Sequence, residues 1–391
     1  MSILSPSPRS TEPGWRLARR ASLAAALAVA LPAAHALEFE YSGFASAIAG
    51  RSFGPCTPDN TLGSRFNGSC TRFIADWSHA GVYTPSVSMK PESRLGLQVI
   101  ARLNDQLSGT TQLVARAANG TQADLEWAYL TYKPSVNWTL QAGRKRLPLF
   151  YFSDFQDVGY AYGWLRPPPD VYGWDVVNYN GANASYQTHL SGWSLKADVF
   201  GGNEESKDNI YSTIIYSGQP KDVLWKNIRG AALELNRAWF TGRLVVIANE
   251  YQQRDRNTDS YDTLNSGRTL GRQRIYGLSA NVDADPWLMR SEYSLFDRSD
   301  FQYKTRAFMV SVGYRVGKFT PMLTTSAYRE TTNFPATYNP LIMRSHALTL
   351  RYEVGQSSSL KLQFDRNKDL SQGVPFGGTA NAVGLGFDTV F

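Results

Sequence analysis

The sequence predicts an all-β fold: a transmembrane, antiparallel, up-and-down β-barrel of about 16 strands. Three observations support this prediction. Segments of nine or ten residues alternate between apolar and polar side chains, no segment keeps a helical period, and the connections alternate between short and long. A soluble sandwich has no reason to place its long loops at every second connection, whereas a lipid-embedded barrel does.

The composition agrees with strands and turns. The 391 residues include 32 Gly, 21 Tyr, 19 Phe and 10 Trp, which favour strands and turns over long helices. No apolar run reaches the roughly 20 residues that a membrane-crossing helix needs. The sequence therefore excludes a membrane protein built from several transmembrane helices.

Residues 1–36 are predicted to be a secretory signal peptide. Arg16, Arg19 and Arg20 precede an apolar stretch at 21–34, and Ala34-His35-Ala36 suits a signal-peptidase site. Cleavage there leaves residues 37–391 as the barrel, with the outer membrane as its destination. Export by a twin-arginine route is the less favoured alternative.

The charge of the mature chain gives no reason to expect a nucleic-acid partner. The full chain has 40 basic and 33 acidic residues, and the leader contains four and one of these. The mature part therefore has 36 basic and 32 acidic residues, a net charge of +4. An excess this small is weak evidence for nucleic-acid binding.

Sixteen strands are predicted from the alternation. In the clearest case, residues 94–103, Leu95, Leu97 and Val99 fall on one face and Gln98 and Arg102 on the other. The predicted strands are 39–51, 94–103, 110–118, 124–133, 138–144, 181–188, 193–202, 228–237, 241–252, 272–283, 287–296, 305–316, 319–330, 345–353, 359–366 and 382–391. Two connections fit the alternation of lengths less well: 119–123 is short where a long loop is expected, and the turn at 238–240 lacks Gly or Pro.

Aromatic residues near the predicted strand ends suit the girdles that barrels place at the membrane interfaces. The residues are Phe39, Tyr41, Trp127, Trp138, Trp193, Trp239, Trp287, Phe319 and Phe391. The last strand ends in Phe391 and carries Phe387, Gly384 and Gly386. This ending resembles the C-terminal assembly signal of Gram-negative outer-membrane barrels.

The segment after strand 138–144 is predicted to set the function. It is long, acidic and aromatic, at 145–175, and the junction resembles that of sixteen-stranded general porins, whose constriction loop folds inward after strand five. The resemblance implies that Asp154 and Asp157 are loop acids, that Arg144 belongs to a basic cluster on the wall, and that the protein is a homotrimer. Further residues are candidates for the wall because they fall on the inward-facing side of their predicted strands: Arg94, Arg102, Gln112, Arg116 and Gln141.

Each of these assignments has an ordinary alternative. The two aspartates can be turn residues in a solvated loop, and Arg94 and Arg102 can lie far from the narrowest point. The loop aromatics are expected to pack the loop against the wall, with a sugar-stacking track as the alternative. General porins usually have fewer aromatics here and no triple proline like 167–169, which puts nonselective passage in doubt.

Neither the cysteines nor the histidines indicate catalysis, and no cofactor or metal is expected. Cys56 and Cys70 enclose a turn-rich stretch and are predicted to form one disulfide in an exported protein. His79, His189 and His346 fit no triad, metal or dinucleotide pattern. The chain is therefore not expected to be an enzyme.

The leading functional hypothesis is a water-filled channel for passive diffusion of small hydrophilic solutes and ions, surrounded by outer-membrane lipids. A substrate-selective channel for sugars or anions is the second hypothesis, on the basis of the aromatic loop and the wall arginines. A binding or enzymatic barrel without an open pore is the third. The sequence does not name the solute.

Overall fold

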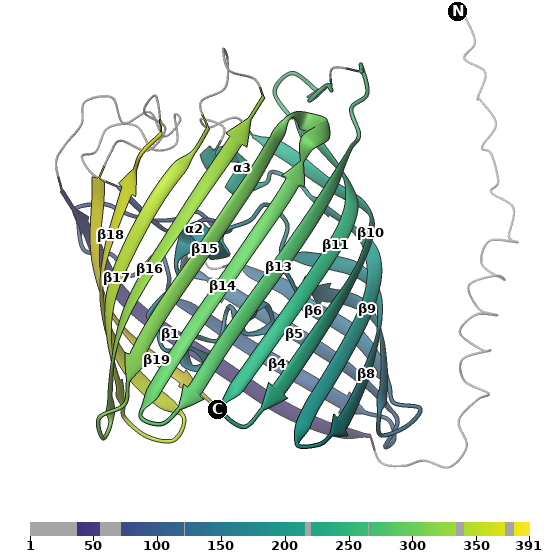
Figure 1. Ribbon diagram of the computed structural model, residues 1–391, viewed down its shortest axis with the longest axis vertical. Coiled ribbons are helices and arrows are strands. Elements are labelled where there is room, and N and C mark those ends of the chain that lie inside the picture. Colours follow the sequence, from purple (N-terminus) through teal and green to yellow (C-terminus); the bar gives the residue numbers. More distant parts are fainter. Residues whose placement is uncertain are drawn as a thin grey trace, which may run out of the picture.

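Sixteen strands of the described residues close into one antiparallel barrel in the computed structural model (Figure 1). The structure describes residues 37–54, 72–120, 122–215, 220–264, 266–333, 340–371 and 379–391. The predicted signal peptide, Cys56 and Cys70 lie outside these residues. The predicted fold class is confirmed.

Each of the sixteen predicted segments corresponds to one barrel strand. The barrel strands are β1 (Glu38–Phe53), β4 (Arg94–Arg102), β5 (Leu107–Arg116), β6 (Ala123–Tyr132), β7 (Trp138–Arg146), β8 (Asn178–Leu190), β9 (Trp193–Ser206), β10 (Lys221–Arg237), β11 (Phe240–Asp255), β13 (Gly271–Ala284), β14 (Trp287–Arg298), β15 (Tyr303–Tyr314), β16 (Phe319–Thr332), β17 (Ile342–Glu353), β18 (Ser358–Asp369) and β19 (Thr379–Val390). Many extend beyond the predicted bounds, because backbone pairing continues where the alternation fades.

The remaining elements are short. The strands β2 (Phe73–Asp76) and β3 (Gly81–Tyr83) pair with each other, and β12 (Ser260–Tyr261) pairs with β11. The α-helices among the described residues are α2 (Pro169–Tyr172) and α3 (Ile210–Ile215). Within the described ranges, no helix combines the length and the apolar character that a membrane crossing requires.

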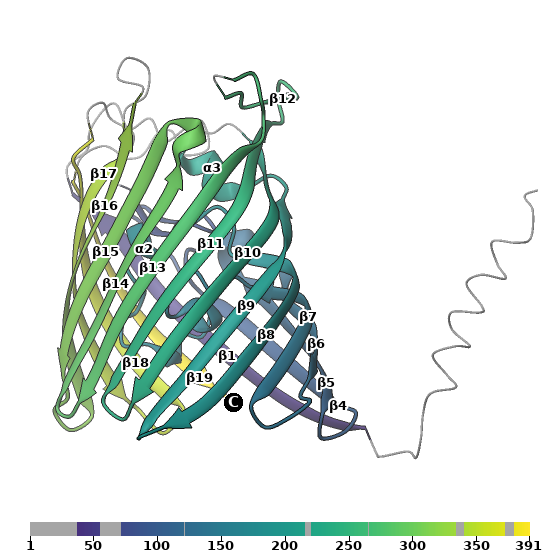
Figure 2. The ribbon, with the colours of Figure 1, turned by 45° about the vertical axis from the view of Figure 1, so that its right-hand side comes forward.

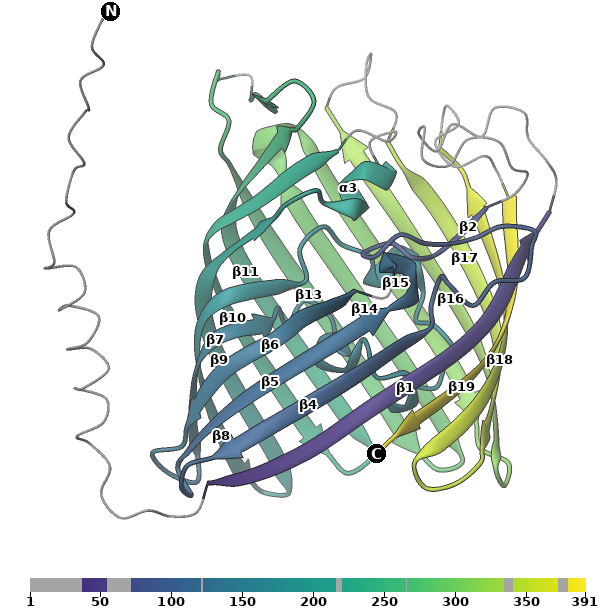
Figure 3. The same cartoon turned by 180° about the vertical axis from the view of Figure 1, so that it is seen from behind.

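β1 closes the barrel by pairing with two strands from opposite ends of the sheet. Its residues 38–46 pair with β4, and its residues 44–53 pair with β19, which Figure 3 shows on either side of the purple strand. The backbone of Phe391 also exchanges two hydrogen bonds with Gly43, at 2.7 and 3.0 Å. Closure leaves the sheet without a free edge.

The strands present apolar side chains outward and polar side chains inward. Leu244, Leu323 and Leu348 are 48%, 64% and 58% exposed on the outside. Inward positions of the neighbouring strands are polar and buried, as at Thr324, Thr349 and Gln363. A water-soluble protein does not expose large apolar side chains on every strand. Such a surface is expected where the strands face lipid.

The lengths of the connections alternate as predicted. The short turns, the start of β1 at Glu38 and the C-terminal Phe391 lie at one end of the barrel, and the longer connections join the strands at the other end. The turn without Gly or Pro is a two-residue turn in which Ala238 takes a positive φ of 35°. We call the two ends the short-turn end and the long-loop end.

A bulge in β6 changes the orientation of one predicted girdle residue. Gln112 pairs with Trp127, but Leu113 pairs with Leu125, so Glu126 is an extra residue in β6. Trp127 consequently lies inside the barrel, where it lines a cavity described below. The predicted girdle position of Trp127 was therefore wrong, because strict alternation does not account for an inserted residue.

Residues 147–177, between β7 and β8, enter the barrel rather than extending above it. Figure 2 shows α2 and the coil around it inside the cylinder, behind β13 and β14. The predicted inward-folded loop is confirmed, and we call residues 147–177 the inner loop.

The seam between β1 and β19 gives a prediction about stability. A Cβ atom on Gly43 would lie 2.5 Å from the Phe391 ring and 2.9 Å from the backbone oxygen of Gly96. Gly43→Ala should therefore destabilise the barrel by about 1–3 kcal/mol through overpacking. The temperature at which the compact form is lost on denaturing gels should fall.

Gly355→Ala is the matched control, because a Cβ atom there would meet nothing within 4 Å. Its transition temperature should equal that of the wild type. Equal transition temperatures for the Gly43 and Gly355 variants would contradict the described closure.

Candidate functional site

Aromatic side chains fix the inner loop against one side of the barrel wall. Trp164 is fully buried, and its indole nitrogen donates to Thr324 at 2.9 Å and to Ser311 at 3.1 Å. The other buried aromatics of the loop are Phe150, Phe152, Tyr162, Tyr172 and Trp174. Because these rings belong to one apolar cluster with wall residues such as Ile275 and Met309, they pack the loop against the wall.

Ion pairs fix the loop at two further points. The Arg166 guanidinium contacts Glu92 at 2.5 and 2.8 Å and also pairs with Asp365 on β18. Asp175, near the end of the loop, pairs with Arg298 on β14 at 2.8 Å. All of these side chains are buried, so removing any one partner would leave an uncompensated charge.

Asp170 connects α2 to the wall and has no cationic partner among the described residues. Its carboxylate accepts hydrogen bonds from Ser326 at 2.8 Å and Ser345 at 3.0 Å. Burial raises the pKa of Asp170 to about 6, against the lowering effect of these two hydroxyls. The inner loop is thus attached to β14, β16, β17 and β18 by different kinds of polar contact.

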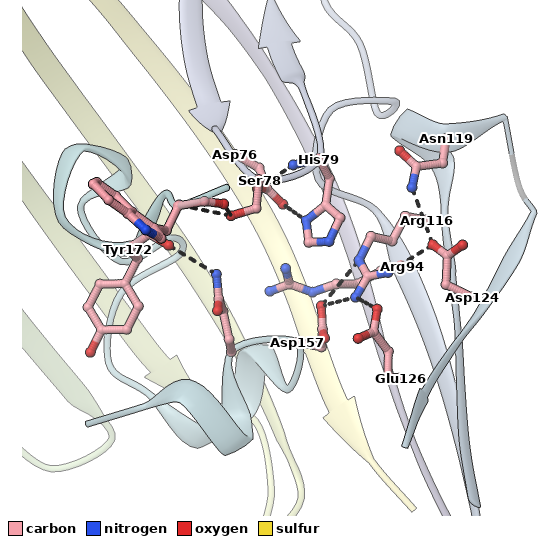
Figure 4. Close-up of polar contacts among 12 residues, drawn as sticks. Asp76, Ser78, His79, Arg94, Arg116, Asn119, Asp124, Glu126, Asp157 and Tyr172 are labelled. Carbon is pink, nitrogen blue, oxygen red and sulfur yellow. Dashed lines mark hydrogen bonds and ion pairs between the residues drawn. The ribbon is translucent and has the colours of Figure 1, made fainter. Parts of the chain in front are cut away.

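Asp157 is the centre of a buried ion cluster on the other side of the lumen. Its carboxylate pairs with Arg116 on β5 at 2.8 Å and with Arg146 at the end of β7. Arg116 also contacts Glu126 at 2.7 Å and Asp124 at 3.2 Å, as Figure 4 shows. The loop acid and the wall arginines therefore meet directly rather than across a water-filled gap.

The ionisation of Asp157 follows from its neighbours. Burial raises the pKa of its carboxyl, but attraction to Arg116 and Arg146 outweighs burial and holds the pKa well below its usual range. The charge of Arg94, on β4, acts in the same direction. Asp157 stays ionised, and the cluster fixes the inner loop to β5 and β7.

Asp154, three residues earlier, faces open space. Its side chain is exposed, and among the described residues it makes no ion pair. It borders a cavity of about 290 Å³ between the loop and the wall, which we call the lower cavity. The charged residues that line the lower cavity are Lys145, Arg146, Asp154, Lys196, Asp198 and Arg243.

Polar groups line the rest of the lower cavity. Lys145 donates to Gln141 and Asn183, which holds its ammonium group at the wall. Arg243 donates to the backbone oxygen of Phe150 at 3.3 Å, and Tyr129 and Trp127 add aromatic surface. A charged, polar space of this kind accommodates water and hydrophilic solutes.

A second cavity of about 300 Å³ lies further towards the long-loop end, and we call it the upper cavity. Along β9, Lys196 and Asp198 line the lower cavity and Glu204 and Ser206 the upper one. The two cavities therefore occupy successive stretches of the same wall.

Arg144 lines the upper cavity because the chain bends before it. Gly143 has φ of 139°, and a Cβ atom there would lie 2.2 Å from the backbone oxygen of Ala128. Arg144 pairs with Glu204 at 2.8 Å and donates to the backbone oxygen of Leu125 at 2.9 Å. The glycine lets a residue of outward parity reach the mouth of the barrel.

The predicted wall residues lie in different surroundings. Gln141 lines the lower cavity and Arg144 the upper one, whereas Arg94 and Arg116 lie against the inner loop. Gln112 is buried and donates to Gln98. Arg102 lies at the short-turn end of β4, where it is exposed and pairs with Glu40 at 2.8 Å, away from the loop.

Several lining residues were not singled out from the sequence, although a signal was present. Lys196 and Asp198 share the polar face of the predicted strand 193–202, and Lys145 has the same parity as Gln141. The sequence does not give the path of the inner loop. This path decides which inward-facing residues border a cavity and which are covered by the loop.

The sequence matches no protein-family model and no curated protein. Solved structures match over almost the whole barrel. The outer membrane channel DcaP of Acinetobacter baumannii is 13% identical, with 92% of this chain and 99% of that chain covered and a TM-score of 0.57. The structure of Salmonella typhi OmpF in complex with daunomycin is 11% identical, with coverage of 91% and 98% and a TM-score of 0.56.

The anion-selective porin from Comamonas acidovorans is 12% identical, with coverage of 91% and 100% and a TM-score of 0.54. Likeness at these identities establishes the architecture. The chain has the fold of the outer-membrane porins.

The structure distinguishes two loop acids that the sequence treats alike. Asp157→Asn should destabilise the barrel by roughly 3–5 kcal/mol, because Arg116 and Arg146 lose a buried counter-charge. Asp154→Asn should leave stability within about 0.5 kcal/mol, because the side chain is exposed. Urea unfolding in lipid vesicles, followed by tryptophan fluorescence, measures both. Equal stabilities of the two variants would contradict the described cluster.

Proposed function

We propose that the chain forms a water-filled channel in the outer membrane, through which small hydrophilic solutes and ions diffuse passively. The observation that carries the proposal is the polar space left beside the inner loop. The loop is fixed to the wall on several sides, yet the lower and upper cavities remain along β6 to β9. An inner loop that narrows but does not fill a sixteen-stranded barrel is what a diffusion channel needs.

The outside of the barrel supports the membrane location. Exposed leucines, valines and phenylalanines cover the strands between their ends. The short turns would face the periplasm and the long loops the exterior, as in other outer-membrane barrels. The similar structures are described as an outer membrane channel and a porin.

Conductance across a planar lipid bilayer tests the proposal. Purified, folded protein should insert and give discrete current steps that persist at low voltage. The same protein, heat-unfolded before addition, is the control and should give none. Folded protein that inserts without conductance would contradict the proposal and would favour a binding or enzymatic barrel.

The charges of the lower cavity favour anions as the better-conducted ions. Arg146 is neutralised by Asp157 in the ion cluster, but three further cations, Lys145, Lys196 and Arg243, line the cavity against two acids, Asp154 and Asp198. An excess of positive charge at a narrow point raises the local concentration of anions. Selectivity for anions is therefore the second proposed property, and sugars are the alternative substrate class.

Substitutions on the two sides of the lower cavity should shift selectivity in opposite directions. Asp154→Asn removes a negative charge and should move the reversal potential in a potassium chloride gradient further towards chloride. Lys196→Gln should move it towards potassium. Arg102→Gln is the control and should leave it unchanged, because Arg102 lies away from the cavities. Reversal potentials that shift in the same direction for Asp154→Asn and Lys196→Gln would show that ions do not pass through the lower cavity.

Liposome swelling separates passive diffusion from sugar selectivity. A passive channel should admit neutral solutes at rates that fall with size. Swelling that is much faster with one sugar than with others of equal size would favour a sugar-selective channel.

We further propose that the protein is a homotrimer, on the strength of its resemblance to general porins. The apparent mass of the unheated protein on a denaturing gel should be about three times that of the heated protein. Mass measurement of the intact complex in detergent checks the stoichiometry, and a monomer under both conditions would contradict it.

A further inference from the structure

The outside of four adjacent strands changes from apolar to basic near the long-loop end. On β15 the outward residues run from Val310 through Phe308 to Arg306, and on β18 they run from Leu362 through Phe364 to Arg366. The outward residues of β16 run from Leu323 through Thr325 and Ala327 to Arg329, and those of β17 run from Leu348 through His346 to Arg344. The exposed cations beyond the apolar surface are Arg306, Arg329, Arg344, Arg366 and Lys368, which we call the basic patch.

The cations of the patch face each other. Arg306 lies directly opposite Arg329 across β15 and β16, and Arg344 lies directly opposite Lys368 across β17 and β18. Like charges at directly opposed positions destabilise a sheet unless something neutralises them. In the parts of the chain that the structure describes, none of the five cations of the patch forms an ion pair.

Cations beside the patch are neutralised by the protein itself. Lys304, on the outward face of β15, pairs with Asp297 at 2.9 Å. Arg272, on the outward face of β13, pairs with Asp300 at 3.1 Å. Arg229 on β10 and Arg274 on β13 are exposed as well, but they lie opposite Ala248 and Asp297, so the directly opposed cations distinguish the patch from these positions.

The other end of the same strands has a different chemistry. Tyr314 on β15 and Phe319 on β16 are exposed there, and Leu360 occupies the corresponding region of β18. The patch is thus restricted to the membrane face nearer the long loops. Only one of the two lipid leaflets would meet it.

We propose that the basic patch binds phosphate groups on the headgroups of lipids in the leaflet around the long-loop end. This inference rests on the proposed function, which places the barrel in a membrane. Four of the five cations are arginines, whose planar guanidinium matches phosphate with two parallel hydrogen bonds. Basic clusters at a membrane interface are the usual sites for anionic headgroups.

Apolar surface next to the patch favours a lipid over a free anion. Phe308 and Phe364 each lie two residues from a patch arginine, on the membrane side. A lipid can place its acyl chains on these side chains while its headgroup reaches the guanidinium groups. A glycolipid with two phosphates, such as lipid A, would span the pairs of opposed cations.

Binding of lipid A tests the inference. The variant Arg306→Gln/Arg329→Gln removes one opposed pair, and its affinity for lipid A in neutral detergent micelles should fall at least about tenfold. The control is Lys133→Gln/Lys318→Gln, which removes two exposed cations at the short-turn end and should bind as the wild type does. Mass spectrometry of the intact complexes reports the bound lipid. Equal affinity of the patch variant and the wild type would overturn the proposal.

Thermal stability provides a second readout, because the difference in unfolding temperature between the patch variant and the wild type should change sign when lipid A is added. Without lipid A, the patch variant should unfold at the same temperature as the wild type or higher, because repulsion between the two arginines is removed. With lipid A, the wild type should be the more stable of the two. A variant that is less stable in both conditions would mean that the arginines stabilise the fold directly, which would overturn the proposal.

Two further measurements distinguish a failure of this inference from a failure of the proposed function. Inorganic phosphate at the same concentration should not reproduce the gain in stability, and an equal gain would show a site for free anions instead of lipids. Conductance in planar bilayers should be the same for the patch variant and the wild type. Normal conductance without lipid binding would overturn this inference alone, whereas loss of conductance in the wild type would overturn the proposed function.

Discussion

The structure depends on one constraint: in hydrocarbon, every backbone N–H and C=O must find a partner within the protein. The closed sheet meets it through the double pairing of β1 with β4 and β19, which removes both edges. Once the sheet is closed, side-chain alternation divides each strand between lipid and lumen. The apolar exterior and the polar interior are therefore consequences of closure.

A closed barrel of this size has an interior that must be partly filled, and the inner loop does this without filling all of it. Its attachments are chemically mixed: Trp164 packs and donates hydrogen bonds, Arg166 forms buried ion pairs, and Asp157 joins two wall arginines. Buried ion pairs carry a cost in desolvation but are specific in geometry. Such contacts hold the loop in one position, which gives the cavities beside it a defined set of charges.

The fold was accessible from the sequence because each strand carries its own evidence. Alternation, turn residues and the terminal Phe391 are local signals, and all sixteen barrel strands followed from them. The site was less accessible because it depends on contacts between distant residues. Asp154 and Asp157 look equivalent in sequence, but only the path of the loop decides that one faces a cavity and the other an ion cluster. Trp127 shows where a prediction from strict alternation fails, because a single extra residue in β6 reverses the orientation of its side chain.

The most direct test of a lipid-facing exterior around a wet lumen uses two adjacent residues of β9. Asp198 lines the lower cavity, whereas Val199 is 58% exposed on the outside. A spin label at each position, in protein with Cys56 and Cys70 replaced by Ser and reconstituted in vesicles, reports its surroundings. The account predicts that the label at 198 collides with a water-soluble nickel complex and the label at 199 with oxygen dissolved in the bilayer. Equal access of both labels to the nickel complex would contradict it.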